Sequence, residues 1–239
     1  MEPYLQGITG HSGAVKDLLF DLGVDTTASL HLRDKELAER LSSTVRGKLD
    51  EAGISQEVIS DLVSVRYCLD DFHADAQLVS DTVDACGRAG GTILALKTLE
   101  NRDVAIGRAL YLDFRTNLIN MIGEAVENMV TLNNIRYFVH GAKGYGGLLC
   151  STLVKYVKGS DLPIVSMVDT GDYIDLSSRC SPEMERKGIN LASAMNFATV
   201  LCSGEGGGHT NAAGGRIKPE YVDQFLKNMD WAVGMQIHE

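Results

Sequence analysis

The most informative stretch of this chain is residues 204–215, which read GEGGGHTNAAGG. Six of these twelve residues are glycine, which has no side chain to pack and loses much conformational freedom on folding. Such a run is typical of a backbone that turns through positive φ or closely approaches another group. His209 follows three glycines, beside main-chain N–H groups that can bind an anion. The stretch therefore predicts a phosphate-binding loop, and the alternative is a flexible surface loop.

Length and charge describe a globular protein with an acidic first part. The 239 residues allow one large domain or two modest ones with a sizeable core. Residues 1–130 contain 12 Lys and Arg against 21 Asp and Glu, whereas residues 131–239 contain 10 against 11. Broad attraction to a polyanion requires clustered positive charge. The sequence therefore argues against non-specific nucleic-acid binding and leaves room for a local positive site in the second part.

Cysteine usage and hydropathy predict a cytoplasmic protein without membrane contact. The five cysteines are widely spaced and form no CxxC pair, which is typical of reduced thiols rather than disulfides or a zinc site. The sequence contains no apolar run of the roughly 20 residues that a membrane span needs. Its start also lacks the basic and hydrophobic segments of a signal peptide.

Hydrophobic spacing divides the chain near residue 132. Residues 1–132 are predicted to be mainly helical, with a long helix over 103–130 and one strand over 61–69. In residues 133–239, segments with the hydrophobic spacing of strands alternate with segments that have the spacing of helices, which predicts a compact α/β domain. The expected strands are 135–140, 163–168, 173–176 and 213–217, and the expected helices are 148–157, 188–202 and 220–231.

Two further segments are expected to meet the glycine stretch. Lys143 lies in a glycine-rich turn between a strand and a helix, and helix N-termini favour anions. A tight structural turn explains the same glycines equally well. Arg179 follows two serines at the end of a strand, and its planar guanidinium matches a phosphate. A surface arginine is the alternative interpretation.

Residues 206–214, GGGHTNAAG, resemble the GGGHxxAAG signature of the DHHA1 domain. That domain is the C-terminal substrate-binding half of DHH-superfamily phosphoesterases, which include RecJ-type single-strand exonucleases and oligoribonucleases. The glycine turn after the first strand, the Ser-Ser-Arg at 177–179 and the Gly-Ile-Asn-Leu at 188–191 support the similarity. Residues 84–88, DACGR, more weakly resemble the connector of archaeal RecJ-like proteins. The resemblance implies a mixed-sheet, DHHA1-like α/β domain after a helical connector.

The resemblance also implies how the site works. Arg179 and His209 would hold the terminal or scissile phosphate of single-stranded nucleic acid or a nucleotide, and the glycine backbone would allow its close approach. The predicted phosphate-binding set is Lys143, Ser178, Arg179, Gly206, Gly207, Gly208, His209 and Asn211.

Catalysis in the family resembles two-metal hydrolysis, with Mn or Mg held by Asp and His motifs of an N-terminal DHH domain. This chain has no DHH triplet, and its nearest acidic cluster is residues 70–75, DDFHAD. We interpret that cluster as exposed charge at a helix start rather than as a metal site. The chain alone is therefore predicted to bind no metal and to be inactive. It is either the C-terminal part of a longer protein or a natural protein that has lost its catalytic half.

Two other functions remain open at this point. The chain could be a non-catalytic module that binds GINS-type replication proteins. Archaeal RecJ-like proteins resemble the lineage of replicative-helicase cofactors that binds the GINS complex. It could also be a tRNA-binding accessory domain, because DHHA1-like domains occur at the ends of alanyl-tRNA synthetases. The near-neutral second part and the lack of interleaved basic and aromatic residues disfavour the tRNA role.

Overall fold

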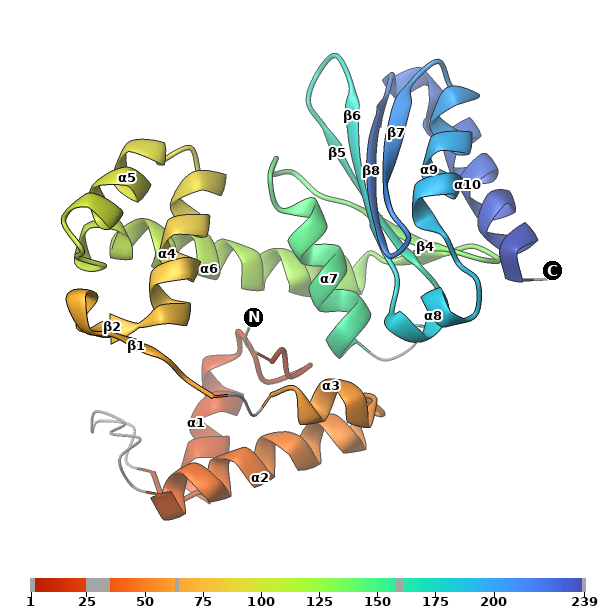
Figure 1. Cartoon of the computed structure of the whole chain (residues 1–239). Helices are drawn as coiled ribbons and strands as arrows, with labels where there is room; N and C mark the ends of the chain where they lie inside the picture. Colours follow the sequence, from red (N-terminus) through yellow and green to blue (C-terminus); the bar gives the residue numbers. More distant parts are fainter. Residues whose placement is uncertain (1–2, 25–34, 63–64, 158–160, 238–239) are drawn as a thin grey trace.

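The computed structural model describes residues 3–24, 35–62, 65–157 and 161–237. In Figure 1 the first part of the chain forms two groups of helices, one below the sheet and one to its left. Their helices are α1 (Ser12–Asp21), α2 (Lys35–Glu51), α3 (Gln56–Ser60), α4 (Ala76–Arg88), α5 (Thr92–Glu100) and α6 (Ala105–Glu127). The short strands β1 (Cys68–Leu69) and β2 (Ala74–Asp75), with the 3-10 turn η1 (Asp70–Phe72) between them, lead into α4. The mainly helical character predicted for the N-terminal region is confirmed.

The second part of the chain is built around a mixed sheet. Its elements are β3 (Val130–Thr131), β4 (Arg136–Val139), α7 (Gly146–Tyr156), β5 (Ile164–Asp169), β6 (Ile174–Arg179), α8 (Pro182–Arg186), α9 (Leu191–Val200), β7 (Glu205–His209), β8 (Ala212–Ile217), the 3-10 turn η2 (Pro219–Tyr221) and α10 (Val222–Ile237). The strands lie in the order β3-β4-β5-β6-β8-β7. β4 and β5 are parallel and joined through α7, whereas the other neighbouring strands are antiparallel. The predicted mixed-sheet α/β fold class is confirmed.

The two faces of this sheet pack against different helices. α9 and α10 cover one face, where the buried core includes Leu176 and Phe225 (Figure 1). α7 covers the other face, where Phe138 and Leu149 are buried. The core on the α7 face continues into the helical part through Phe114 of α6, whose ring stacks on Tyr145 at a centroid distance of 4.5 Å. The helical part therefore packs directly against the start of α7.

A buried carboxylate from α10 fixes the turn between β3 and β4. Asp230 Oδ1 accepts hydrogen bonds from the backbone amides of Asn134 and Ile135, at 2.6 and 3.2 Å. Its Oδ2 accepts a bond of 3.3 Å from the Asn133 side chain. Several N–H donors compensate the burial of one carboxylate. The boundary predicted between residues 132 and 133 lies in this turn, and the division into two domains remains a prediction.

Two sequence expectations about local structure are wrong. Residues 204–209 were expected in a loop, but 205–209 form β7, an edge strand paired with β8. Glycine weakens a strand, so packing against neighbours rather than local propensity holds this segment extended. The strand expected over 61–69 is reduced to β1, and residues 63–64 lie outside the described part. Within the described ranges, no helix is both long and apolar enough to cross a membrane.

Candidate phosphate-binding site

The glycines of β7 have two different roles. A Cβ built on Gly206 would lie 2.7 Å from Thr199 Oγ1, so this glycine allows β7 to approach α9. Gly208 has φ +146°, and a Cβ there would lie 2.4 Å from the carbonyl oxygen of Ala212 in β8. A Cβ on Gly207 would meet no described atom within 4 Å. Gly206 and Gly208 therefore serve packing, whereas Gly207, which pairs with Gly214, leaves bare backbone on the α7 face of the sheet.

Arg179 and His209 lie on the same face of the sheet. Both residues pair with Ala212, Arg179 from β6 and His209 from β7. Residues directly opposite each other in neighbouring strands share a face, and successive residues alternate between faces. Ser178 accordingly lies on the other face, where it is buried and its hydroxyl donates to the carbonyl of Ala213 at 3.3 Å. The register therefore places Arg179 and His209 in one row on the same face, with β8 between them, and places Ser178 on the opposite face.

The guanidinium of Arg179 lies at the beginning of α7. A Cβ built on Gly147, in the first turn of this helix, would lie 2.8 Å from Arg179 Nη2. Nη1 donates to the carbonyl of Ser178 at 2.8 Å, which orients the guanidinium. The first amides of a helix have no intrahelical partner, and the side chain of the N-cap residue, Tyr145, makes no capping bond. A permanent positive charge thus lies beside uncapped N–H groups, the combination that binds anions.

Three polar side chains converge beneath this helix start. A Cβ built on Gly146 would lie 2.6 Å from Ser166 Oγ, 3.1 Å from Ser177 Oγ and 3.2 Å from His140 Nε2. We call these three residues with Arg179, around Gly146 and Gly147, the α7 polar cluster. The pairing of β5 with β6 places two of its members side by side, because Ser166 pairs with Ser177.

Two members of the α7 polar cluster are buried without compensation. His140 is 8% exposed and Ser166 is 1% exposed. Neither ring nitrogen of His140 nor Oγ of Ser166 has a hydrogen-bond partner of normal geometry among the described residues. Burial lowers the pKa of His140, an effect that the nearby backbone of Ala142 partly offsets. Because unsatisfied buried polar groups are rare in stable proteins, the α7 polar cluster is a candidate functional site.

The comparisons with known proteins concern the family and fold of the part that carries this cluster. Residues 135–234 match the DHHA1 domain family. This part of the chain is a DHHA1 domain. An uncharacterized protein of Methanocaldococcus jannaschii is 29% identical over 238 residues, and the match covers 99% of this chain and 51% of that relative. The chain thus spans about half the length of this relative.

Solved structures share the fold of the chain beyond the DHHA1 domain. CDC45 from Entamoeba histolytica is similar over 95% of this chain and 52% of its own, at 10% identity and a TM-score of 0.61. RecJ from Thermus thermophilus is similar over 66% of this chain and 25% of its own, at 18% identity and a TM-score of 0.50. At these identities the likeness shows the fold alone.

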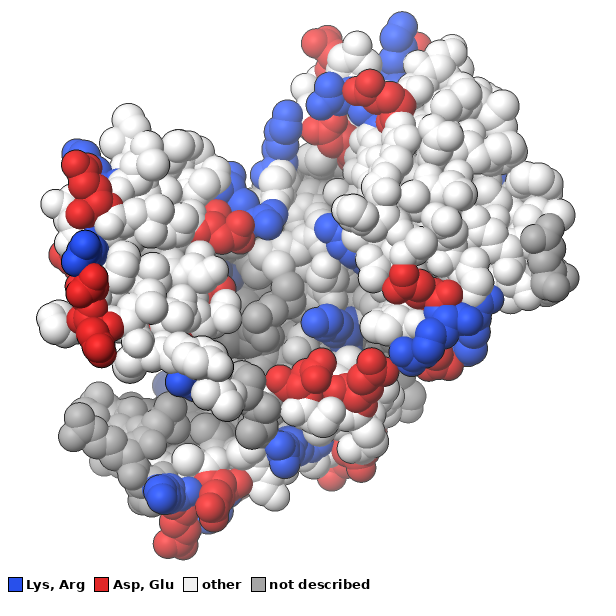
Figure 2. Space-filling model, viewed as in Figure 1, with Lys and Arg blue, Asp and Glu red and all other residues white. Residues whose placement is uncertain are grey.

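Further charged residues surround the cluster of the DHHA1 domain. Lys143 Nζ lies 3.6 Å from Asp175 Oδ2, two residues before Ser177 on the same face of β6. Arg88, at the end of α4, donates from Nη1 to the carbonyl of Gly144 at 3.1 Å, so the helical part also brings a guanidinium to the start of α7. Figure 2 shows Lys and Arg side chains on both walls of the hollow between the helical part and the sheet. The sequence contained Arg88 within the DACGR segment, but only the fold places it here.

The remaining predicted residue, Asn211, makes a different contact. Its side-chain amide donates to Glu185 Oε2 at 3.1 Å. Of the predicted set, the structure therefore gathers Lys143, Arg179, Gly207 and His209 on one face of the DHHA1 domain. Sequence reasoning did not assign a role to His140 or Ser166, because neither lies in a recognisable motif. It quoted Ser177 with Arg179 but did not include it in the phosphate-binding set.

The acidic cluster at residues 70–75 is not arranged as a metal site. Asp71 pairs with Arg102 at 2.7 Å, and Asp75 accepts bonds from Arg66 and from the first amides of α4. Within the part of the chain that the structure describes, no group of three or more His, Cys, Asp or Glu residues could hold a metal ion. The described residues do not fit the two metal ions that the family resemblance implies.

Proposed function

We propose that this chain is the substrate-binding half of a DHH-type phosphoesterase, and that its DHHA1 domain grips the terminal phosphate of single-stranded nucleic acid or a short oligonucleotide. The observation that carries this proposal is the position of Arg179, at the uncapped start of α7 and in the same register row as His209. A guanidinium and helix N–H groups are strong donors to phosphate oxygens. This arrangement suits a compact anion, such as the phosphate at the end of a nucleic-acid strand. Binding along an extended strand would instead need a long basic surface.

Each group has a defined task in this proposal. Arg179 and the first amides of α7 bind phosphate oxygens, and the Ser177 hydroxyl adds a donor from the same face. Gly207 and Gly214 provide a floor without side chains, so a sugar or phosphate can lie against the strands. His209, which is exposed at the end of β7, closes the far side of this floor. Lys143 and Arg88 attract the phosphate electrostatically but do not select a base.

Binding of a 5′-phosphorylated oligonucleotide, measured by fluorescence anisotropy, tests the proposal. Arg179→Ala and His209→Ala should each weaken binding while leaving the fold intact, because a charge-assisted hydrogen bond is worth about 1.5–3 kcal/mol. Lys187→Ala is the matched control, because Lys187 is an exposed cation that pairs with Glu183 at the other end of α8. Unchanged affinity in both site variants would overturn the proposal.

Hydrolysis is proposed to depend on groups other than the described residues. When bound, two Mn or Mg ions would stabilise the charge that develops on the scissile phosphate. Because the described residues offer no fitting metal cluster, this chain by itself should bind its ligand without cleaving it. A nuclease assay with added Mn²⁺ checks this expectation. Robust cleavage that Asp71→Ala abolishes would contradict it.

A protein-docking role of the GINS type is the second candidate. α5 exposes Ile93, Leu96 and Leu99, at 69%, 61% and 46%. Exposed apolar side chains gathered on one short helix are typical of interaction surfaces. CDC45 from Entamoeba histolytica is similar in fold over 95% of this chain. A purified GINS-type complex that binds the wild-type chain but not Leu96→Asp would support this role. If Arg179→Ala binds the complex as tightly as the wild type does, protein docking is separate from phosphate binding.

A further inference from the structure

The turn between β7 and β8 does not have the backbone geometry that hairpins of its length prefer. His209 and Ala212 form the last pair of the two strands, so the loop consists of Thr210 and Asn211 alone. Two-residue hairpin loops favour turns with positive φ, which match the twist of the strands. Neither loop residue is among the described residues with positive φ. Contacts from outside the hairpin must therefore hold this turn.

One carboxylate contacts both loop residues. Glu185 of α8 accepts a hydrogen bond from the hydroxyl of Thr210 and another, of 3.1 Å, from the side-chain amide of Asn211. The loop carbonyls are satisfied separately: that of Thr210 accepts from Leu191 N at 2.8 Å, and that of Asn211 accepts from Cys180 N at 3.2 Å. Among the described side chains, Glu185 is the one that bonds to both residues of the turn.

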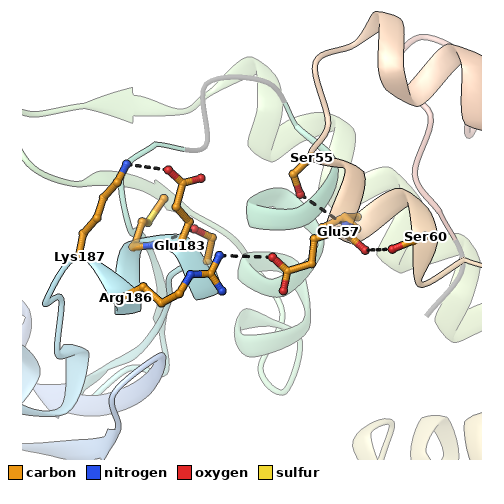
Figure 3. Close-up of polar contacts among 9 residues, drawn as sticks. Ser55, Glu57, Ser60, Glu183, Arg186 and Lys187 are labelled. Carbon is orange, nitrogen blue, oxygen red and sulfur yellow. Dashed lines mark hydrogen bonds and ion pairs between the residues drawn. The ribbon is translucent and has the colours of Figure 1, made fainter.

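α8 is itself fixed at both ends. Ser181 caps its start by accepting a bond of 3.2 Å from Met184 N. Arg186 lies 3.3 Å from Glu57 of α3, so the helix is tied to the helical part of the chain (Figure 3). Glu185 is therefore presented from a capped helix in which the neighbouring Met184 is buried, rather than from a free loop.

We propose that Glu185 is a positioning residue: by fixing the turn of Thr210 and Asn211, it fixes the direction of the His209 side chain, which the strand register places on the sheet face that carries Arg179. The inference rests on the proposed phosphate-binding function. His209 immediately precedes the turn, so relaxation of the turn changes the direction of its side chain first. Arg179 lies in β6, which β8 separates from β7, and its guanidinium lies at the start of α7.

The dissociation constant of a 5′-phosphorylated oligonucleotide tests this inference in three variants. Glu185→Ala should weaken binding roughly 2- to 10-fold, the change that corresponds to losing one ordinary hydrogen bond. Glu185→Gln should bind like the wild type, because a glutamine amide can still bond to both loop side chains. Glu183→Ala, on the same helix but paired with Lys187, is the matched control and should leave affinity unchanged.

A double-mutant cycle distinguishes positioning of His209 from general loosening. Glu185→Ala should cause no further loss of affinity in the His209→Ala background. In the protein that retains His209, Glu185→Ala should shift the ring NMR resonances of His209, whereas Glu183→Ala should not. Equal weakening by Glu185→Ala in both backgrounds, or unchanged affinity in the wild-type background, overturns the inference alone. If His209→Ala itself leaves affinity unchanged, the role of His209 in the proposed function fails, and the inference fails with it.

Discussion

The guanidinium of Arg179 rests on Gly147, so one added methyl group tests whether this guanidinium binds phosphate. In Gly147→Ala the new Cβ would lie 2.8 Å from Nη2 and 3.5 Å from Cζ of Arg179. Because the closest atom is the end of a flexible side chain, Arg179 must move while the backbone of α7 stays in place. The substitution therefore displaces the charge without removing it.

The two measurable effects of Gly147→Ala should have opposite signs. Loss of a charge-assisted hydrogen bond of about 1.5–3 kcal/mol corresponds to binding that is roughly 10- to 150-fold weaker. Alanine in place of glycine in a helix favours folding by up to about 1 kcal/mol. A variant that is as stable as the wild type, or more stable, should thus bind the phosphorylated oligonucleotide poorly.

Fluorescence anisotropy with a 5′-phosphorylated strand gives the affinity, and urea denaturation gives the free energy of unfolding. Gly123→Ala is the matched control, because a Cβ on this glycine of α6 would meet no described atom within 4 Å. It should raise stability and leave affinity unchanged. Wild-type affinity in a folded Gly147→Ala protein would refute the assignment of Arg179 as a phosphate ligand.

Three further predictions concern stability, each measured by urea denaturation. Gly206→Ala should lower the free energy of unfolding by about 1–3 kcal/mol through overpacking against α9, whereas Gly207→Ala, with open space around it, should not. Asp230→Ala should cost about 3 kcal/mol or more, because it leaves the buried amides of the β3–β4 turn without an acceptor. Burial lowers the pKa of His140 in the folded protein. As the pH falls, the imidazole is therefore protonated at a higher pH in the unfolded chain than in the folded one. Stability should consequently fall as the pH drops below about 6.5, and a smaller pH dependence is expected in His140→Gln. A pH dependence equal in both proteins would contradict that cause.

Much of this architecture could be predicted from residue patterns alone. The β-rich runs at 135–140 and 163–168 and the helical run at 220–231 are the strands β4 and β5 and the helix α10. These elements are predictable because the spacing of their apolar residues reflects which side each one buries. The stretch 206–214 likewise indicated the DHHA1 domain, because it resembles the signature of that family, and residues 135–234 match the family.

The arrangement of the site was decided by tertiary structure. A two-residue period puts Ser178 and Arg179 on opposite faces, but no local pattern tells which face α7 will cover. β7 is extended because α9 and β8 pack against its bare backbone, although glycine by itself disfavours a strand. His140, Ser166 and Ser177 meet around Gly146 only because β4, β5 and β6 lie side by side and α7 returns over them. Residue types are local, whereas the distance between a guanidinium and a helix start depends on the whole sheet.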